Sequence, residues 1–567
     1  MYTASSAILE ALVEAGVEYL FANFGSDHPG LIEAIAQARA ANRPCPKVIT
    51  CPTEMVAMSA AHGYAQASGR AQAVLVHVDC GTQALGGAVH NAAKGRAPVL
   101  ILAGMSPATQ EGEARGSRNE FIQWIQDVPD QRGLVRGYVR YENEIRLGAN
   151  ARQIVHRALQ FAHSAPAGPV YVTATREVLE SEVPRVNLDM AQWRPLAPTG
   201  LNPDAAREIA GALAAAEHPL IVTSYLGRSV AAVQELVALA EQLGIGVIES
   251  VPNHVNFPTT HSCYLGVQWN ERRQNEALVR ADVVLVIDSD VPWIAAVSRP
   301  HDGARIFHID ADPLKERMPL WYIGATLQCQ ADSAQALPQI RAALDEFVPD
   351  PERIARRRQQ LAAEHDAWQA GIREREQPRE ALTAEFLVAA IRDAVGENAI
   401  VVSESVTNFH VVSQHMRRTR PGTLFSSGGG SLGYNGGAAV GVKLARPDAL
   451  VVAICGDGSY LFSQPSTVHW MARRYQAPFL HVVLNNGGWR APRHAVLSVH
   501  PDGIAAKSPN IDIDFAQPPD YAGIAAAAGG AHAERVRSVA ELKPALERAL
   551  QAIRKEKRAA VIDAHVL

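Results

Sequence analysis

The sequence predicts an α/β fold made of three βα domains with mostly parallel sheets. Apolar runs such as "ALVVAIC" (449–455) and "DVVLVIDS" (282–289) are nearly continuous, which is typical of strands buried on both faces, and they alternate with helical patterns. In addition, a chain of 567 residues is too long to fold around a single hydrophobic core. At about 150 residues per domain, it would form three or four domains. Helix-covered parallel sheets, repeated along the chain, account for both observations.

The first predicted domain comprises residues 1–185. A helical pattern at its start leads into a strand pattern, and this rhythm continues up to the run "GPVYVTA". It ends in a Pro-containing stretch, 181–205, which has no clear period and is predicted to be a linker. The expected helices are 6–17, 54–68 and 85–95, and the expected strands are 19–25, 73–78, 98–104 and 168–174.

The second and third predicted domains comprise residues 195–345 and 380–567. A highly charged stretch between them, 347–380, is predicted to be a helical connector with a solvated face. The first and third domains each contain a glycine-rich strand end, so we expect two variations on one architecture. The expected strands are 219–224, 244–250, 282–289 and 304–311 in the second domain, and 398–405, 449–455, 479–486 and 559–567 in the third.

Composition points to a small-molecule partner. The hydrophobic content of 47% and charged content of 20% are those of a globular protein, and the net charge of −5 gives no electrostatic reason to expect nucleic acid or a membrane surface. The six cysteines form no CxxC pair, which fits reduced thiols in the cytoplasm. The N-terminus has no basic n-region, and no apolar run is long enough to span a bilayer. We therefore expect a cytoplasmic location.

Two strand ends in the third domain carry oxygen ligands. Asp457 follows the run 449–455, and the pair Asn485 and Asn486 ends the run 479–486. Turn chemistry explains either motif alone. Together they fall at the same edge of a parallel sheet, where ligands bind, and such hard oxygen donors suit Mg²⁺ beside a phosphate. The amides of Gly458 and Ser459 would face that phosphate. The residues therefore predict a Mg²⁺-diphosphate site.

At this point the sequence resembles the thiamine diphosphate-dependent decarboxylases and carboligases, which include acetolactate synthase, benzoylformate decarboxylase and benzaldehyde lyase. The resemblance covers essentially the whole chain, and its strongest motif is "GDGS" followed by "NN". It implies thiamine diphosphate and Mg²⁺ as cofactors. It also implies that Asp457, Asn486 and the carbonyl of Gly488 are the metal ligands. The interval between the motifs is slightly long, which leaves Asn485 as the alternative to Asn486.

The same resemblance implies a set of cofactor contacts. The loop "VSESVTNFH" is similar to the one that holds the diphosphate, and "SSGGGSLGYNGG" to the segment around the thiazolium ring. Leu432 takes the place of the apolar residue that folds the cofactor into a V; an ordinary core leucine is the alternative. The implied cofactor-binding residues are Val406, Thr407, Gly430, Leu432, Gly456, Gly458, Ser459 and Trp489.

Glu54, in "CPTEMVAMSAAHGYA", corresponds to the family's glutamate that hydrogen-bonds the aminopyrimidine ring. A carboxyl group in a dry cleft has a raised pKa, which suits proton sharing with that ring. The alternative is an exposed glutamate in the first turn of a helix. In the family this glutamate and the diphosphate site meet across a subunit interface. The resemblance therefore implies a homodimer or homotetramer.

Four further residues are predicted near the reacting carbon. His77, in "AVLVHVDCGTQ", resembles the active-site histidine of benzoylformate decarboxylase and could relay a proton. A buried strand histidine is the alternative. Asp27 and His28, in "FGSDHPGL", form an acid-imidazole pair at a strand end, which suggests a proton relay or a carboxylate contact. Gln123 resembles a glutamine near the substrate in acetolactate synthase.

These residues imply an enzyme that acts on 2-keto acids by decarboxylation and carboligation, with pyruvate an expected donor and an aldehyde a possible acceptor. Thr53 replaces the family's frequent histidine, and no paired "HH" occurs in the first domain, which argues against simple acetaldehyde production. The alternatives are a 2-hydroxyacyl-CoA lyase or oxalyl-CoA decarboxylase, and a catalytically silent paralogue. Nothing in the central domain gives a clear reason to predict FAD or a nucleotide.

Overall fold

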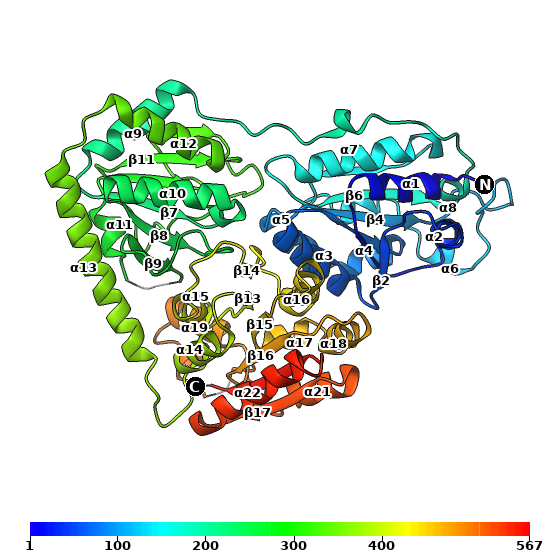
Figure 1. Ribbon diagram of the computed structural model, residues 1–567. Coiled ribbons are helices and arrows are strands. Elements are labelled where there is room, and N and C mark those ends of the chain that lie inside the picture. Colours follow the sequence, from blue (N-terminus) through cyan, green and yellow to red (C-terminus); the bar gives the residue numbers. More distant parts are fainter. Residues whose placement is uncertain (271–272, 510, 567) are drawn as a thin grey trace.

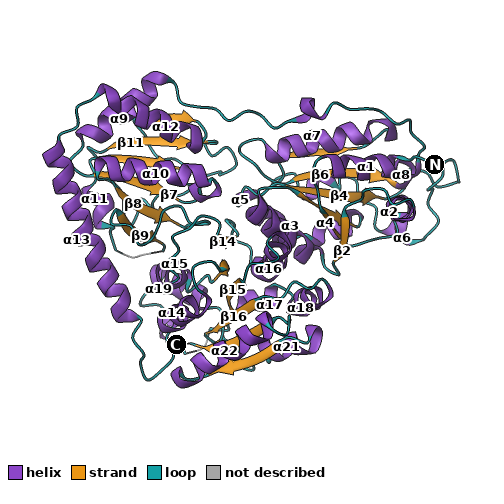
Figure 2. Cartoon of the chain, viewed as in Figure 1, coloured by secondary structure: helices purple, strands orange, loops and turns teal. Residues whose placement is uncertain are grey.

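The computed structural model describes residues 1–270, 273–509 and 511–566. Within these residues the named strands form three six-stranded sheets, and every pairing between them is parallel. Helices cover the sheets, and the three domains are arranged as a triangle (Figures 1 and 2). The predicted α/β fold with mostly parallel sheets is therefore confirmed. The last residue of the predicted strand 559–567 lies outside the described residues.

The N-terminal sheet holds the strands β1 to β6. Its interior strands are almost fully buried, as their apolar runs predict. The strands are β1 (Tyr19–Ala22), β2 (Lys47–Thr50), β3 (Gln72–Val76), β4 (Val99–Met105), β5 (Tyr141–Glu144) and β6 (Val170–Thr175), in the order β2-β1-β3-β4-β6-β5. The helices are α1 (Ala4–Glu14), α2 (Pro29–Ala40), α3 (Glu54–Ser68), α4 (Val78–Ala84), α5 (Gly87–Lys94), α6 (Ile122–Ile125), α7 (Ala151–His163) and α8 (Arg176–Glu180).

The central sheet follows an irregular stretch with a short 3₁₀ turn at Met190–Trp193 and an isolated antiparallel bridge from Glu182 to Thr3. Its strands are β7 (Pro219–Thr223), β8 (Gly246–Ser250), β9 (Tyr264–Gln268), β10 (Val283–Ile287), β11 (Arg305–Asp310) and β12 (Leu327–Gln330), in the order β12-β11-β10-β7-β8-β9. The strand order reverses between β7 and β10. Its helices are α9 (Pro203–Ala215), α10 (Val230–Leu243), α11 (Glu276–Arg280) and α12 (Ser333–Ala343).

The charged connector is the long helix α13 (Pro351–Arg375), which runs along one side of the triangle to the C-terminal domain (Figure 1). That domain has the strands β13 (Ile400–Glu404), β14 (Leu424–Ser426), β15 (Val451–Gly456), β16 (Leu480–Asn485), β17 (His532–Val536) and β18 (Ala560–His565). Its helices are α14 (Ala384–Val395), α15 (Phe409–His415), α16 (Tyr434–Ala445), α17 (Asp457–Phe462), α18 (Pro465–Arg474), α19 (Arg490–Val499), α20 (Ile504–Lys507), α21 (Tyr521–Gly529) and α22 (Val539–Arg554).

The N-terminal and C-terminal sheets share one strand order. The C-terminal order β14-β13-β15-β16-β18-β17 repeats the N-terminal order strand for strand, in agreement with the expected relation between the two domains. The strands expected from the sequence are the interior strands of the three sheets. The strands that were not expected, β2, β5, β9, β12, β14 and β17, are the edges.

The N-terminal and C-terminal domains meet where α3 packs against α16. Glycine allows this close approach: a Cβ at Gly63 would overlap the backbone of Ala438, and a Cβ at Gly441 would overlap the carbonyl of Ala60. The helix backbones therefore touch with no side chain between them. Because Glu54 is the first residue of α3, this contact also fixes the start of that helix relative to the C-terminal domain.

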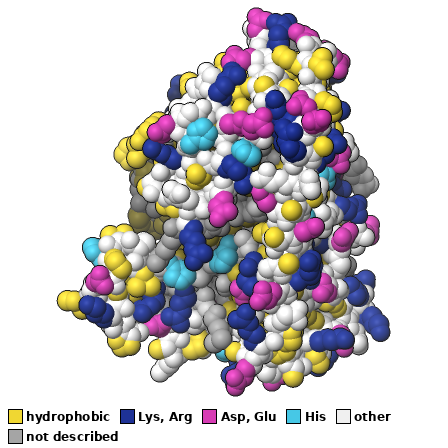
Figure 3. Space-filling view, turned by 90° about the vertical axis from the view of Figure 1, so that its left-hand side faces the viewer, with side chains coloured by type: hydrophobic (Ala, Val, Ile, Leu, Met, Phe, Trp, Pro, Cys, Tyr) yellow, Lys and Arg dark blue, Asp and Glu magenta, His cyan; other side chains and the backbone are white. Residues whose placement is uncertain are grey.

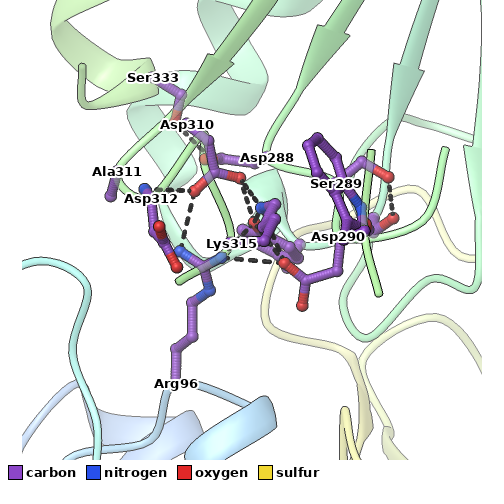
Figure 4. A network of polar contacts seen from close by, with 12 residues as sticks. Arg96, Asp288, Ser289, Asp290, Asp310, Ala311, Asp312, Lys315 and Ser333 are labelled. Carbon is purple, nitrogen blue, oxygen red and sulfur yellow. Dashed lines mark hydrogen bonds and ion pairs between the residues drawn. The ribbon is translucent and has the colours of Figure 1, made fainter. Parts of the chain in front are cut away.

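A buried ion network joins the N-terminal domain to the central domain (Figure 4). Arg96, just after α5, reaches Asp310 at the end of β11 and Asp290 beyond β10, with N–O distances of 3.0 Å to each. Lys315 lies 2.6 Å from Asp310, and Tyr225, just after β7, donates to the same carboxylate. These side chains fill the point where the strand order reverses, the usual place for a ligand in such sheets.

The visible surface shows charges of both signs. Lys and Arg side chains alternate with Asp and Glu over the face in Figure 3, without a broad field of one sign. In the described part of the chain, no helix combines the length and apolar character needed to cross a membrane.

Candidate active site

A cavity of about 280 Å³ lies at the carboxyl edge of the C-terminal sheet. Three neighbouring strands, β13, β15 and β16, end at it, as expected for a ligand site in a parallel sheet. Of the predicted cofactor residues, only Gly430 is outside its lining; the Gly430 amide donates to His90 on α5 instead. The lining residues are Ser405, Val406, Thr407, Asn408, Leu432, Gly456, Asp457, Gly458, Ser459, Phe462, Asn486, Gly488, Trp489, Arg490, Ala491 and Pro492.

Asp457 follows β15 directly, and backbone amides hold its carboxylate. Oδ1 accepts from the Gly458 N–H at 2.8 Å, and Oδ2 accepts from the Gly488 N–H at 2.9 Å. The Gly458 amide therefore faces the carboxylate rather than a phosphate. Burial raises the pKa of Asp457, while the two amides oppose the rise. Arg490, the basic side chain in the lining, pairs with Asp514, so a bound cation is the group that would best stabilise ionised Asp457.

The two asparagines at the end of β16 have different surroundings. Asn485 donates to Asp563 at 2.9 Å and accepts from the Gly487 N–H at 3.2 Å, so its side chain is engaged at both ends. Oδ1 of Asn486 is buried and has no hydrogen-bond partner among the residues that the structure describes. An unpaired amide oxygen in the same cavity as a buried carboxylate fits a Mg²⁺ ligand set. The geometry favours Asn486 over Asn485.

Leu432 is half-buried in the cavity wall, and Glu404 anchors the segment that carries it. The Glu404 carboxylate, at the end of β13, accepts from the amides of Gly433 at 2.6 Å and Asn435 at 2.9 Å. Burial raises the pKa of Glu404 to about 8, although these amides oppose the rise. The sequence pattern did not single out Glu404, because only the tertiary fold brings it to the start of α16.

The N-terminal sheet carries Glu54 at its carboxyl edge. Glu54 follows β2 and begins α3, half-buried. Burial raises the pKa of its carboxyl, which the positive charge of His77 opposes. A Cβ placed on Gly81 would lie 3.2 Å from Glu54 Oε1 and 3.4 Å from the His77 Cβ, so Glu54 and His77 flank the same glycine.

Asp27 and His77 form a close pair at that edge. Asp27 follows β1, His77 follows β3, and Nδ1 of His77 lies 2.5 Å from Oδ1 of Asp27. Burial opposes the ionisation of Asp27, but His28 and the hydrogen bond from His77 outweigh it and hold the Asp27 pKa below its ordinary value. The same bond raises the pKa of His77, against the effect of burial. The pair therefore favours a carboxylate beside an imidazolium.

Two glycines leave room for this pair. A Cβ at Gly25 would overlap the His77 ring, and a Cβ at Gly104 on β4 would overlap the Asp27 carboxylate. His28 is fully buried behind them: Nδ1 accepts from the Gly25 N–H at 3.0 Å, and Nε2 lies 3.2 Å from Asp27, outside hydrogen-bond geometry. Burial lowers the pKa of His28, while the Asp27 carboxylate opposes the fall.

The predicted Gln123 points away from His77. It is buried, and its Oε1 accepts from the amides of Asn119 at 2.9 Å and Glu120 at 3.3 Å. Gln126, one turn further on, contacts the histidine instead, with Oε1 3.0 Å from Nε2 of His77. The repeated glutamine in "FIQWIQD" was the available signal, but the sequence does not say which of the two faces the site.

The candidate site thus consists of two halves. The 280 Å³ cavity is lined by C-terminal residues, whereas Glu54, Asp27 and His77 lie on the N-terminal sheet. A larger cavity, of about 760 Å³, lies between the N-terminal and central domains beside Arg96; within the described part of the chain, its lining includes none of the predicted site residues.

Three sequence models of one family match the chain, one in each of its three domains. The thiamine pyrophosphate enzyme N-terminal TPP binding domain matches residues 2–134, the central domain matches 206–340, and the C-terminal TPP binding domain matches 405–564. The chain belongs to the thiamine pyrophosphate enzyme family. It is a thiamine diphosphate-dependent enzyme, as the sequence resemblance implied.

Relatives in this family span nearly the whole chain. Benzoylformate decarboxylase of Pseudomonas aeruginosa is 27% identical over 542 residues, covering 90% of this chain and 91% of that protein. Sulfoacetaldehyde acetyltransferase of Castellaniella defragrans is 24% identical, covering 99% and 92%. A solved benzoylformate decarboxylase of Polynucleobacter necessarius superposes with a TM-score of 0.79 at 18% identity, covering 100% of this chain and 99% of that one. The last likeness concerns the fold.

Proposed function

We propose that this enzyme decarboxylates 2-keto acids and joins the product to an aldehyde or a second keto acid, with thiamine diphosphate and Mg²⁺ as cofactors. The observation that carries the proposal is the Asp27–His77 pair beside Glu54, on a sheet edge that matches the one bearing Asp457. The names of the relatives, which include benzoylformate decarboxylase and acetolactate synthases, support 2-keto acids as the substrate class.

The C-terminal half would hold the diphosphate through a cation. Asp457 and Asn486 offer a carboxylate and an unpaired amide oxygen, which suit Mg²⁺, and the Gly488 carbonyl is the third proposed ligand. Val406, Thr407 and Ser459 line the same cavity. The bound cofactor supplies a carbon nucleophile and an electron sink for breaking the bond beside a keto group.

The N-terminal half would supply the proton chemistry. Glu54 has a raised pKa and can share a proton with a ring nitrogen of the cofactor. His77, held by Asp27, can donate a proton to the developing product and take one back. Because the cavity is lined by C-terminal residues, we propose that a second subunit covers it with its own Glu54 and His77, in a homodimer or homotetramer.

A substrate panel tests this function. Purified enzyme with thiamine diphosphate and Mg²⁺ is given pyruvate, benzoylformate and larger 2-keto acids, with and without aldehydes, and products are identified by NMR. We expect CO₂ release and carboligation products, and a loss of at least about a hundredfold in Glu54→Gln. Turnover only with CoA thioesters would favour the CoA lyase alternative. If no substrate is converted, and cofactor plus Mg²⁺ do not raise the melting temperature, the silent-paralogue alternative stands.

A further inference from the structure

His77 is held at both ring nitrogens by groups from different segments. Asp27, in the loop after β1, lies at Nδ1, and Gln126, just after α6, lies at Nε2. Gln126 is 6% exposed, and its amide nitrogen is buried without a partner among the described residues. A buried amide nitrogen without a hydrogen-bond partner costs free energy. That Gln126 bears this cost while its oxygen contacts the imidazole points to a role for the contact.

We propose that Gln126 is a positioning residue: it holds His77 at Nε2 while Asp27 holds Nδ1, and so controls the nitrogen that exchanges a proton with the substrate. This inference rests on the proposed function of His77 as a proton relay. Gln126 touches no reacting atom and acts only through the histidine.

The amide group of Gln126 can form a hydrogen bond with both the protonated and the neutral ring of His77. A carbonyl oxygen only accepts, so Nε2 facing Oε1 carries a hydrogen, and with a hydrogen on Nδ1 toward Asp27 the ring is a cation. After Nε2 gives up its proton, its lone pair needs a donor. Rotation of the Gln126 amide brings the unpaired NH₂ group to Nε2. The ring then keeps its position while the proton leaves and returns.

The charges around His77 set the direction of the effect. Asp27 favours the cation most, and Gln126 and Asp79 add to it, whereas burial opposes it. Glu54 lies nearby as a third carboxyl group, and burial lowers the pKa of His28. Removal of the Gln126 oxygen takes away one group that stabilises the cation. The pKa of His77 should then fall, while a carboxylate in place of Gln126 should raise it.

The test is a histidine titration of the full chain with thiamine diphosphate and Mg²⁺ bound. Protein labelled with ¹³C at histidine Cε1 is titrated by NMR, and the His77 signal is identified from its absence in His77→Gln. We expect the midpoint for His77 to fall by about half to one pH unit in Gln126→Leu and to rise in Gln126→Glu. The pH dependence of kcat should show the same shift in the apparent pKa that reports His77, while KM changes less.

Gln123→Leu is the matched control, because Gln123 is a buried glutamine of the same segment without a contact to His77. Its His77 midpoint should equal that of the unmodified chain. An unchanged midpoint in Gln126→Leu, or an equal shift in Gln123→Leu, overturns the inference; thermal unfolding of each variant verifies that it is folded. The titration needs no turnover, so shifted midpoints without 2-keto acid conversion would refute the proposed function and leave the positioning role intact.

Discussion

At the scale of single residues, the same side chain has different consequences at adjacent positions. Asn485 and Asn486 follow one another, yet one completes the protein's own hydrogen bonds and the other leaves an oxygen open in the cavity. Burial makes that difference large, because an unpaired buried oxygen has lost its water without gaining a partner. We therefore assign Asn486 to metal binding and Asn485 to the stability of the fold.

We expect Asn486→Ala to weaken Mg²⁺ binding by at least about tenfold, since a ligand oxygen is lost, with little change in stability without metal. Asn485→Ala should instead lower the free energy of unfolding by about 1–3 kcal/mol, because Asp563 and the Gly487 amide lose their partner. Mg²⁺ titration of cofactor binding and urea unfolding measure the two effects. Weaker Mg²⁺ binding in Asn485→Ala alone would exchange the two assignments.

Gly104 leaves the space that the Asp27 carboxylate occupies. We expect Gly104→Ala to push the carboxylate away from His77, to destabilise the fold by about 1–3 kcal/mol, and to reduce turnover while cofactor still binds. Gly137→Ala is the control, because a Cβ there meets no atom within 4 Å of the described structure. Turnover, cofactor affinity and urea unfolding distinguish the two variants. Full activity in Gly104→Ala would mean that the Asp27 position is not needed.

At the scale of elements, burial decides which strands are visible in the sequence. Interior strands such as β10 are buried on both faces and give unbroken apolar runs, which were predicted. Edge strands are short and half polar: β5 reads "YENE" and β12 reads "LQCQ". They pair with one neighbour only, so their sequences resemble loops. This accounts for β5 and β12, whereas β14 is only three residues long and β9 is interrupted by a glycine.

The residues of the candidate site also differ in whether the sequence could predict them. Residues at the ends of interior strands, such as Asp457 and His77, were predictable, because parallel strands place their carboxyl ends together. Gln126 and Glu404 were not, because their partners are set by how a loop and a helix start fold onto the sheet edge. Spacing along the chain carries no information about such contacts.

The α3–α16 contact gives a prediction at this scale. We expect Gly441→Ala to force the two helices apart and to destabilise the protein by about 1–3 kcal/mol, because its Cβ would meet the Ala60 carbonyl. Gly371→Ala, within α13, should do the opposite and stabilise by about 0.5–1 kcal/mol, because only the Arg375 side chain is near. Urea unfolding of both variants measures the two signs. Equal effects would show that helix propensity, not close approach, governs Gly441.

At the scale of the whole molecule, buried polar groups lie where the N-terminal domain meets each of the other two domains. Arg96 joins the N-terminal and central domains through Asp310, which is fully buried, and Asp290, which is partly exposed. The ring of His62 on α3 packs against Tyr434 of the C-terminal domain, and His254 of the central domain is close enough to affect its charge. Both ring nitrogens of His62 lack partners among the described residues, and burial lowers the pKa of His62 and His254 to about 3.

This junction predicts loss of stability in acid. Below about pH 6.5 the unfolded chain binds protons at His62 that the folded chain does not, so stability falls with pH down to about 3. Between pH 7.5 and 5 the contribution of His62 is about 2 kcal/mol. In His62→Leu the loss between these pH values should be smaller by that amount, measured by urea unfolding at both. His301→Leu, an exposed histidine, should keep the original loss; a change there instead would contradict the assignment.

Because the two halves of the site lie on separate sheets, two differently mutated chains can complement each other. If each cavity is completed by the neighbouring subunit, a chain damaged at Glu54 and a chain damaged at Asp457 are defective in different halves. A mixed dimer then contains one centre with both lesions and one with neither. Two alleles that are each inactive alone would then yield active enzyme when expressed together, while two lesions in the same half would not. Complementation between mutants would thus map which residues act across the interface.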